Sequence, residues 1–203
     1  MKSINNYILE KLVINKNIKR QYEHKYFPKT KEELQDIIKQ KIKDEGNECD
    51  LNDIDVSEIT DMSWLFNGSK FNGDISEWNV SNVKDMQSMF LHSEFNGDIS
   101  EWDVSNVEDM TGMFYHSKFN SDISSWNVCS VKDMYDMFSY SKFNQDISKW
   151  NVDNVSNMEQ MFFKSNFNKD LSKWDIHNVE YIDNIFKDSP LEGKEQEWWG
   201  RTT

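Results

Sequence analysis

Residues 71–90 read FNGDISEWNVSNVKDMQSMF, and close copies of this stretch begin at Phe95, Phe119, Phe143 and Phe167. Successive copies are therefore 24 residues apart. A fixed period of this length is typical of repeat proteins, in which each repeat buries its apolar face against its neighbours. The sequence thus predicts a stack of repeats that presents a long and regular surface.

The period extends beyond the five clear copies at both ends and divides the chain into three regions. Residues 47–70 match the repeat at its apolar positions and form a divergent first turn. Terminal repeats are expected to diverge because one of their faces has no neighbour. We therefore predict an N-terminal segment at 1–46, a repeat domain of six turns at 47–190, and a partial closing repeat that reaches its strand, followed by a tail, at 191–203.

Two apolar patterns within one repeat predict two short elements. Trp78 and Val80 lie two positions apart, as on one face of a short strand. The spacing of Val83, Met86 and Met89 predicts a short α-helix or 3₁₀-helix with one apolar face. The predicted fold is therefore α/β: a right-handed solenoid of 24-residue turns, each with a short strand and a short helix.

The N-terminal segment at 1–46 lies outside the repeat and predicts two helices. Residues 3–12 carry apolar side chains at helical spacing. Further on, Thr30 and Glu33 form a capping box before an apolar stripe, and Gly46 follows as a stop. We expect this second helix to cover the open end of the first repeat rather than to act as an independent binding helix. The segment as a whole is interpreted as either a helical cap or a targeting segment.

The net charge of −13 is unevenly distributed along the 203 residues. Residues 1–46 hold 11 basic and 7 acidic side chains, so the rest of the chain is strongly acidic. An acidic repeat surface repels phosphates, which argues against a nucleic-acid partner. Acidity also keeps a repeat protein soluble, and we expect a monomer.

The cysteines and the apolar runs indicate the cellular compartment in which the protein is expected. Cys49 and Cys129 are the only cysteines and form neither a metal motif nor a disulfide framework, which fits a reducing compartment. No apolar run is long enough to span a bilayer, and the first residues lack the apolar core of a secretory signal. Cys49 follows no apolar stretch and does not resemble a lipid-attachment cysteine. The sequence as written therefore predicts a cytoplasmic protein without a membrane span.

Residues at the same position of successive copies form a column along the repeats, and two such columns of polar residues have a structural interpretation. Asp74 and Asn72 recur in the later copies and could form a calcium ladder, because hard cations prefer oxygen ligands. Stacked Asn and Asp side chains also satisfy turn backbone groups, and the glycine at Gly73 and Gly97 is replaced by Ser121, Gln145 and Lys169 in the later copies, so we expect no metal. The chain contains no phosphate-binding loop and no nucleophile-and-base arrangement, so we expect neither an enzyme nor a cofactor. The constancy of the tryptophan column predicts that it is buried.

Binding specificity is expected at positions where the copies differ. Aromatic side chains lie beside polar ones at these positions, as in many protein-binding surfaces. Neutral drift on a solvated face is the alternative interpretation. The candidate binding residues are Leu91, His92, Tyr115, His116, Tyr135, Tyr140, Phe163 and Lys164.

The repeat phrase resembles that of the BspA-like leucine-rich-repeat surface proteins, a group also described as a mycoplasma-type lipoprotein repeat of unknown function. The resemblance covers residues 47–190 and implies a leucine-rich-repeat-like solenoid, with short parallel strands on one side and short helical segments on the other. Members are often surface-attached adhesins or binding proteins of bacteria, which implies display at the cell surface. Residues 1–11 are also similar to leaders that direct some bacteriophage proteins into the capsid, which implies virion association.

These observations predict a non-enzymatic module that binds a protein partner through its repeat surface. A bacterial surface adhesin or glycan-binding protein is the alternative, and an exposed tryptophan column would favour it. A phage accessory protein that binds a host factor is a third hypothesis. The sequence does not name the partner.

Overall fold

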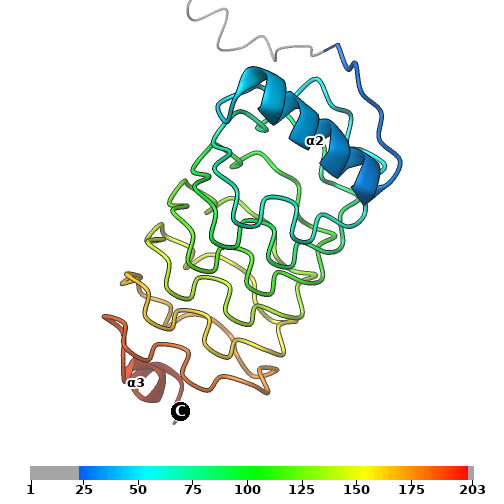
Figure 1. The fold of residues 1–203 in the computed structure, drawn as a ribbon. Helices are drawn as coiled ribbons and strands as arrows, with labels where there is room; N and C mark the ends of the chain where they lie inside the picture. Colours follow the sequence, from blue (N-terminus) through cyan, green and yellow to red (C-terminus); the bar gives the residue numbers. More distant parts are fainter. Residues whose placement is uncertain (1–22, 201–203) are drawn as a thin grey trace, which may run out of the picture.

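The computed structural model describes residues 23–200, which form a row of stacked coils with a helix at each end (Figure 1). Helix α2 spans Lys31–Glu45 and helix α3 spans Lys194–Trp199. Neither of these described helices is long and apolar enough to cross a membrane. The helix expected at residues 3–12 and the leader-like segment at 1–11 lie outside the described residues.

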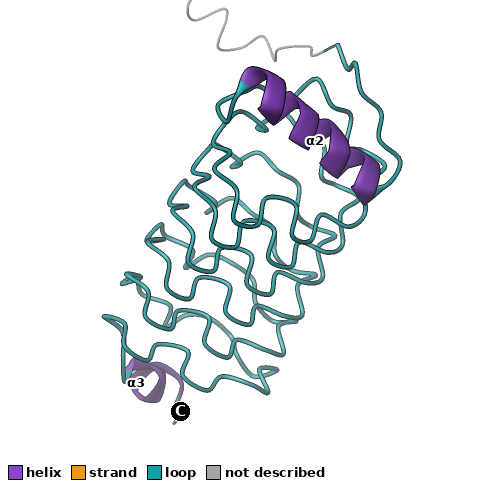
Figure 2. Cartoon of the chain, in the orientation of Figure 1, coloured by secondary structure: helices purple, strands orange, loops and turns teal. Residues whose placement is uncertain are grey.

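The predicted α/β solenoid with short parallel strands and short helices is wrong. Within residues 23–200 the coils contain neither extended strands nor helices, and there is no sheet (Figure 2). Neighbouring coils are joined instead by isolated parallel bridges, such as those from Asp85 to Asp61 and from Asp85 to Asp109. A leucine-rich-repeat solenoid is therefore not supported, although the 24-residue period does set the register between coils.

The coils lack strands and helices because their backbone N–H groups are divided between two kinds of acceptor. The N–H of Met86 donates to the Asp109 carbonyl of the next coil, whereas the N–H of Met89 donates back to the Met86 carbonyl. The N–H of Phe90 then donates to the next coil again, at Met113. A helix would bond each N–H four residues back, and a strand would bond both of its neighbours. This alternation between the next coil and a tight turn produces neither element.

The apolar positions of the repeat are buried, as predicted. Each tryptophan from Trp78 to Trp174 is 4% exposed, and its Nε1–H donates to a carbonyl of the preceding coil, as Trp102 does to Ile75 at 3.1 Å. Phenylalanine rings stack along the row, with centroids 5.6 Å apart between Phe90 and Phe114. The shared interior of the repeats is thus confirmed.

Polar ladders satisfy the turns, which confirms the structural interpretation of the Asn and Asp columns. The Asn72 amide oxygen accepts the N–H of Asn96 in the next coil at 2.8 Å. Asp74 accepts the N–H of Ser76 at 2.9 Å within its own coil. Because these oxygens already bind backbone donors, the columns stabilise the turns.

Helix α2 begins and ends at the predicted residues. The Thr30 hydroxyl accepts the Glu33 N–H at 3.2 Å, and the Gly46 N–H donates to the Ile42 carbonyl at 2.9 Å. The Glu33 carboxylate differs from a standard capping box because it accepts from the Lys29 N–H. Leu34 and Ile38 of α2 are buried against the core, at the end of the row that begins with the first repeat (Figure 1).

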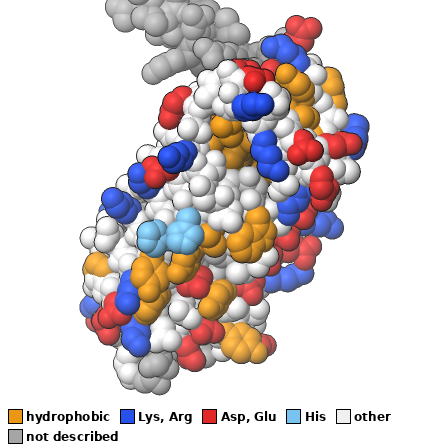
Figure 3. All heavy atoms as spheres, viewed as in Figure 1, with side chains coloured by type: hydrophobic (Ala, Val, Ile, Leu, Met, Phe, Trp, Pro, Cys, Tyr) orange, Lys and Arg blue, Asp and Glu red, His pale blue; other side chains and the backbone are white. Residues whose placement is uncertain are grey.

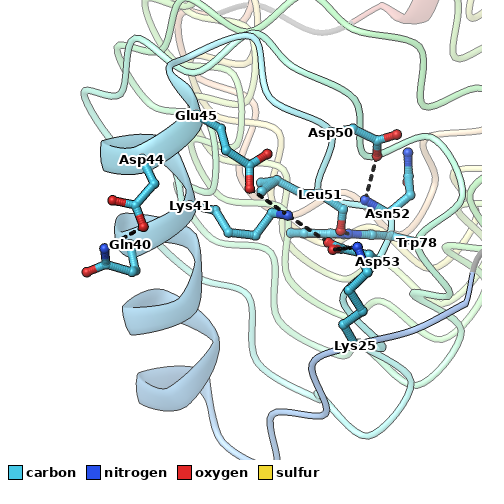
Figure 4. Close-up of polar contacts among 10 residues, drawn as sticks. All are labelled: Lys25, Gln40, Lys41, Asp44, Glu45, Asp50, Leu51, Asn52, Asp53 and Trp78. Atoms are coloured by element: carbon cyan, nitrogen blue, oxygen red, sulfur yellow. Dashed lines mark hydrogen bonds and ion pairs between the residues drawn. The ribbon is translucent and has the colours of Figure 1, made fainter.

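Lys41 is a buried charge that the apolar stripe of α2 did not predict (Figure 4). Its ammonium lies 2.9 Å from the Asp53 carboxylate and 3.4 Å from Glu45. Burial acts to lower the pKa of Lys41, but the hydrogen bonds and charges of Asp53 and Glu45 outweigh it and raise that pKa. Lys25 also reaches Asp53 at 3.4 Å, so one carboxylate joins α2 and the preceding segment to the first coil.

The strand expected in the closing repeat is also wrong. Gly193 has φ 85°, a left-handed conformation that glycine adopts at little cost, and α3 starts at the next residue. Trp198 and Trp199 of α3 pack on the ring of Phe186, with centroids 5.9 and 5.7 Å away. Helix α3 thus covers part of the last coil.

Candidate binding face

Six of the eight candidate residues form one continuous line of side chains across four coils. The His92 and His116 rings lie 4.8 Å apart, and the His116 and Tyr140 rings 6.0 Å apart. Tyr140 then contacts Phe163 edge-on at 5.4 Å. We call this line the aromatic ridge, and it consists of His92, Tyr115, His116, Tyr140, Phe163 and Lys164. Figure 3 shows histidine side chains beside hydrophobic ones on one face.

Left-handed backbone turns hold the ridge outward. His92, His116, Tyr140 and Lys164 all have φ between 51° and 55°, and Gly68 takes the same place in the first coil. This conformation is uncommon for residues other than glycine and costs about 1–2 kcal/mol. The structure tolerates it because each N–H is fixed to the next coil, as that of His92 is to the Tyr115 carbonyl at 2.9 Å.

The cationic end of the ridge is at Lys164. Its ammonium lies 5.5 Å from the centre of the Tyr140 ring and 5.1 Å from that of Phe163. Asp188 of the following coil lies 3.9 Å away. The ridge therefore already binds one cation of its own chain over two aromatic faces.

Tyr135 and Leu91 flank the ridge without belonging to it. Leu91 is half-buried and precedes Tyr115 by one coil in the same column. Tyr135 lies in a different column, where its hydroxyl accepts a hydrogen bond of 3.4 Å from the Gln160 amide. The structure thus brings together six of the eight predicted residues and places the other two at the sides.

Asp136 is a residue of this face that sequence reasoning missed. Burial raises the pKa of its carboxyl, and so does the charge of Glu159, although hydrogen bonds from Ser139 and Tyr135 oppose the change. Burial, followed by the charge of Asp136, raises the pKa values of Tyr115 and Tyr135. The available signal was that Asp136 is acidic in a column that otherwise reads Trp64, Ser88, Gly112, Gln160 and Asn184.

A column of carboxylates runs along the bridge positions of the same coil segments. Asp85 sits between Asp61 and Asp109, one in each neighbouring coil. Burial raises the pKa of Asp85, and the two neighbouring charges add to that effect despite a hydrogen bond from the Gln87 N–H. Lys31 of α2 pairs with Asp61 at 3.1 Å and offsets the charge at that end.

A shallow groove lies on a different part of the coils. It has a volume of about 670 Å³ and includes Lys84, Glu108, Cys129 and Lys132 in its lining, and none of the candidate residues. Among residues 23–200, no group of three or more His, Cys, Asp or Glu side chains is placed to hold a metal ion. The ridge thus offers aromatic faces, imidazoles and nearby charges for recognition.

Comparison with known proteins identifies a family. The protein-family model described as "Mycoplasma protein of unknown function, DUF285" matches residues 33–142 and, in an overlapping second match, residues 117–199. No curated protein and no solved structure matches the chain. Because the two matches together cover most of the sequence, the chain belongs to this mycoplasma-type repeat family of unknown function.

Proposed function

We propose that this protein is a non-enzymatic binding module whose aromatic ridge contacts a protein partner. The observation that carries the proposal is the unbroken run of ring contacts from His92 through His116 and Tyr140 to Phe163. Aromatic side chains bury a large area at little cost in conformational entropy and are enriched among the residues that dominate binding energy. A line of them across four coils suits an extended partner segment.

Backbone strain accompanies the ridge and also occurs outside it, at Ser88, Asp136 and Gln160. The same turn position holds His92, His116 and Tyr140 in three successive coils, although the first coil has a glycine there, Gly68. Large side chains at left-handed positions cost stability and persist where the surrounding structure compensates, as they do at many functional sites.

The alternative function is that of a surface adhesin or glycan-binding protein, and exposed tryptophans would favour it. The tryptophans of the repeat column are each 4% exposed and their Nε1–H groups are satisfied inside the protein, so they offer no sugar platform. The resemblance to BspA-like proteins supports a related proposal, in which the same ridge binds a protein at a cell surface.

Affinity capture from a lysate of the source cell, followed by mass spectrometry, tests the proposed function. The test variant combines Tyr115→Ser, Tyr140→Ser and Phe163→Ser, which remove three ridge rings that are not fully buried. The matched control is Tyr181→Ser, because Tyr181 is 57% exposed and lies outside the ridge. We expect the triple variant to lose partners that the wild type and the control retain.

A thermal melt of the triple variant shows whether it remains folded. A folded triple variant that captures the same partners in the same amounts as the wild type would contradict the proposal. Equal loss of partners in the Tyr181→Ser control would also contradict it, because exposed aromatic area in general would then explain the binding.

A further inference from the structure

The contact of the Lys164 ammonium with two rings of the ridge shows that the ridge can bind a cation. Its ammonium sits within 5.5 Å of the centres of two rings, Tyr140 and Phe163. A cation over an aromatic face gains about 0.5–1 kcal/mol at exposed sites and more when water is excluded. The C-terminal end of the ridge is therefore already occupied by a cation from this chain.

The neighbouring part of the face has the same chemistry but no such cation. Tyr115 and Tyr135 meet at Gly112, whose N–H donates to the Tyr135 carbonyl at 2.7 Å and whose carbonyl accepts the Tyr115 N–H at 3.0 Å. The Gln160 amide lies 3.4 Å from both the Tyr135 hydroxyl and the Glu159 carboxylate. Asp136 follows Tyr135 in the chain, and its charge helps to raise the pKa values of both tyrosines. Within residues 23–200, no lysine or arginine lies over either ring or pairs with Asp136 or Glu159. Two aromatic faces beside uncompensated carboxylates are a common setting for binding a guanidinium or ammonium group.

The charge of the whole face agrees with this local picture. The coil segments equivalent to 85–92, taken over all six coils, hold eight carboxylates and only two lysines, and each of the eight acidic residues is at least partly exposed. Only Asp61 and Asp188 among them are paired with a lysine of the described residues. Complementary charge across an interface steers association and excludes partners of the wrong sign.

We infer, building on the proposed function, that the partner is a protein segment rich in arginine or lysine, which places a basic side chain over Tyr115 and Tyr135 beside Asp136 and Glu159. The neighbouring ridge rings contact the rest of the segment. Lys164 marks the end of the site, because its own charge repels a further basic side chain there.

Fluorescence anisotropy with labelled peptides tests the inference on the full chain. The probes are a nine-residue peptide of alternating Arg and Ser and a matched peptide of alternating Glu and Ser. We expect the Arg peptide to bind and the Glu peptide not to bind, with affinity that falls as salt is raised. Glu159→Gln and Tyr135→Ser should each weaken Arg-peptide binding about fivefold, in line with one cation–π or charge contact.

Matched variants separate a site from general attraction to an acidic protein. Glu101→Gln removes one exposed carboxylate from a different column, beside Trp102 and Asp103, and should change the affinity less than about twofold. Tyr181→Ser is the corresponding aromatic control. Equal weakening by Glu101→Gln and Glu159→Gln, or no binding of the Arg peptide, would overturn the inference.

Competition distinguishes this inference from the proposed function. Excess Arg peptide should release the partner captured through the ridge, and the Glu peptide should not. Capture that depends on the ridge but resists the Arg peptide would overturn the basic partner and leave the proposed function standing. Self-association of the protein that the Arg peptide dissolves would assign a second copy as the occupant and would overturn the inference as well.

Discussion

Phe114 and Tyr115 are adjacent in the sequence, yet their columns follow different rules. Phe114 is fully buried, and its ring lies 5.6 Å from those of Phe90 and Phe138 in the two neighbouring coils. Tyr115 is only half-buried and meets its neighbours at ring edges and tilted angles. The inner column keeps phenylalanine in every coil, whereas the outer column reads Leu91, Tyr115, Ser139 and Phe163.

The difference shows what stacking imposes on a repeat protein. A side chain in the inner column is packed by two coils besides its own, so a change there disturbs three coils at once. Leu91, Tyr115 and Phe163 of the outer column are only half-buried, although the smaller Ser139 is covered. A large side chain in this column therefore meets solvent on one side, and its identity can follow the needs of a partner. Four substitutions test this contrast, from the largest expected effect on stability to the smallest.

Phe114→Ala should destabilise the protein most. Removing the ring leaves a cavity between Phe90, Phe119 and Phe138, and large-to-small changes of this kind cost about 3–5 kcal/mol. Urea unfolding followed by tryptophan fluorescence measures the loss. A cost below about 1 kcal/mol would show that neighbouring coils collapse into the space and that the inner column is not constrained by stacking.

Asp53→Ala should have the next largest effect, at the end of the stack. It leaves the buried Lys41 ammonium with Glu45 as its remaining carboxylate, and breaking a buried pair on one side costs about 2–3 kcal/mol when a second acceptor stays. The same urea titration measures it. Combining Asp53→Ala with Lys41→Met should recover most of the loss, and a double variant as unstable as Asp53→Ala would argue against the ion pair as the cause.

Asp85→Asn should stabilise the protein by about 0.5–1 kcal/mol at pH 7, because it removes a like charge from a column of stacked carboxylates. The asparagine oxygen can still accept the Gln87 N–H. At the corresponding position of a later coil, Asn157 donates to the Asp133 carboxylate at 3.1 Å.

The pH dependence of Asp85→Asn follows from the raised pKa of Asp85. A folded pKa above the unfolded value of about 3.9 means that the folded state holds the proton more tightly, so stability falls as pH rises through that window. The advantage of Asp85→Asn should therefore be full at pH 7, shrink as the pH falls through the raised folded pKa of Asp85, and be lost below the unfolded value of about 3.9. Asp98→Asn, an exposed control, should show no such gain, and an equal gain there would refute the explanation.

Tyr140→Ser should have the smallest effect on stability, within about 0.5 kcal/mol, because surface substitutions away from packed features usually fall in this range. Tyr140 is 38% exposed, and its ring meets Phe163 edge-on, Tyr115 at a tilted angle and His116 in a stacked arrangement. Thermal unfolding measures the change. A loss comparable to that of Phe114→Ala would mean that the ridge is part of the core, and the contrast between the two columns would fail.

Prediction from sequence succeeded where the signal was local or repeated, and failed where neighbouring coils compete for the same backbone group. The cap at Thr30 and the stop at Gly46 were predictable because both depend on bonds within a few residues. The strand predicted at Trp78 is absent, because the Trp78 N–H closes a turn by donating to the Ile75 carbonyl. Asp136 was missed because nothing in the spacing of one column shows which rings of other columns it lies beside.

The sequence by itself determined the 24-residue period, the buried side chains and the register between coils, since all three follow from the same apolar residues returning at fixed intervals. Only the tertiary structure decided the backbone conformation of each coil, the burial of Lys41 and the contact between ridge residues 24 positions apart. Apolar spacing specifies which side chains face inward, but an N–H group chooses its acceptor only once the next coil has placed a carbonyl within reach.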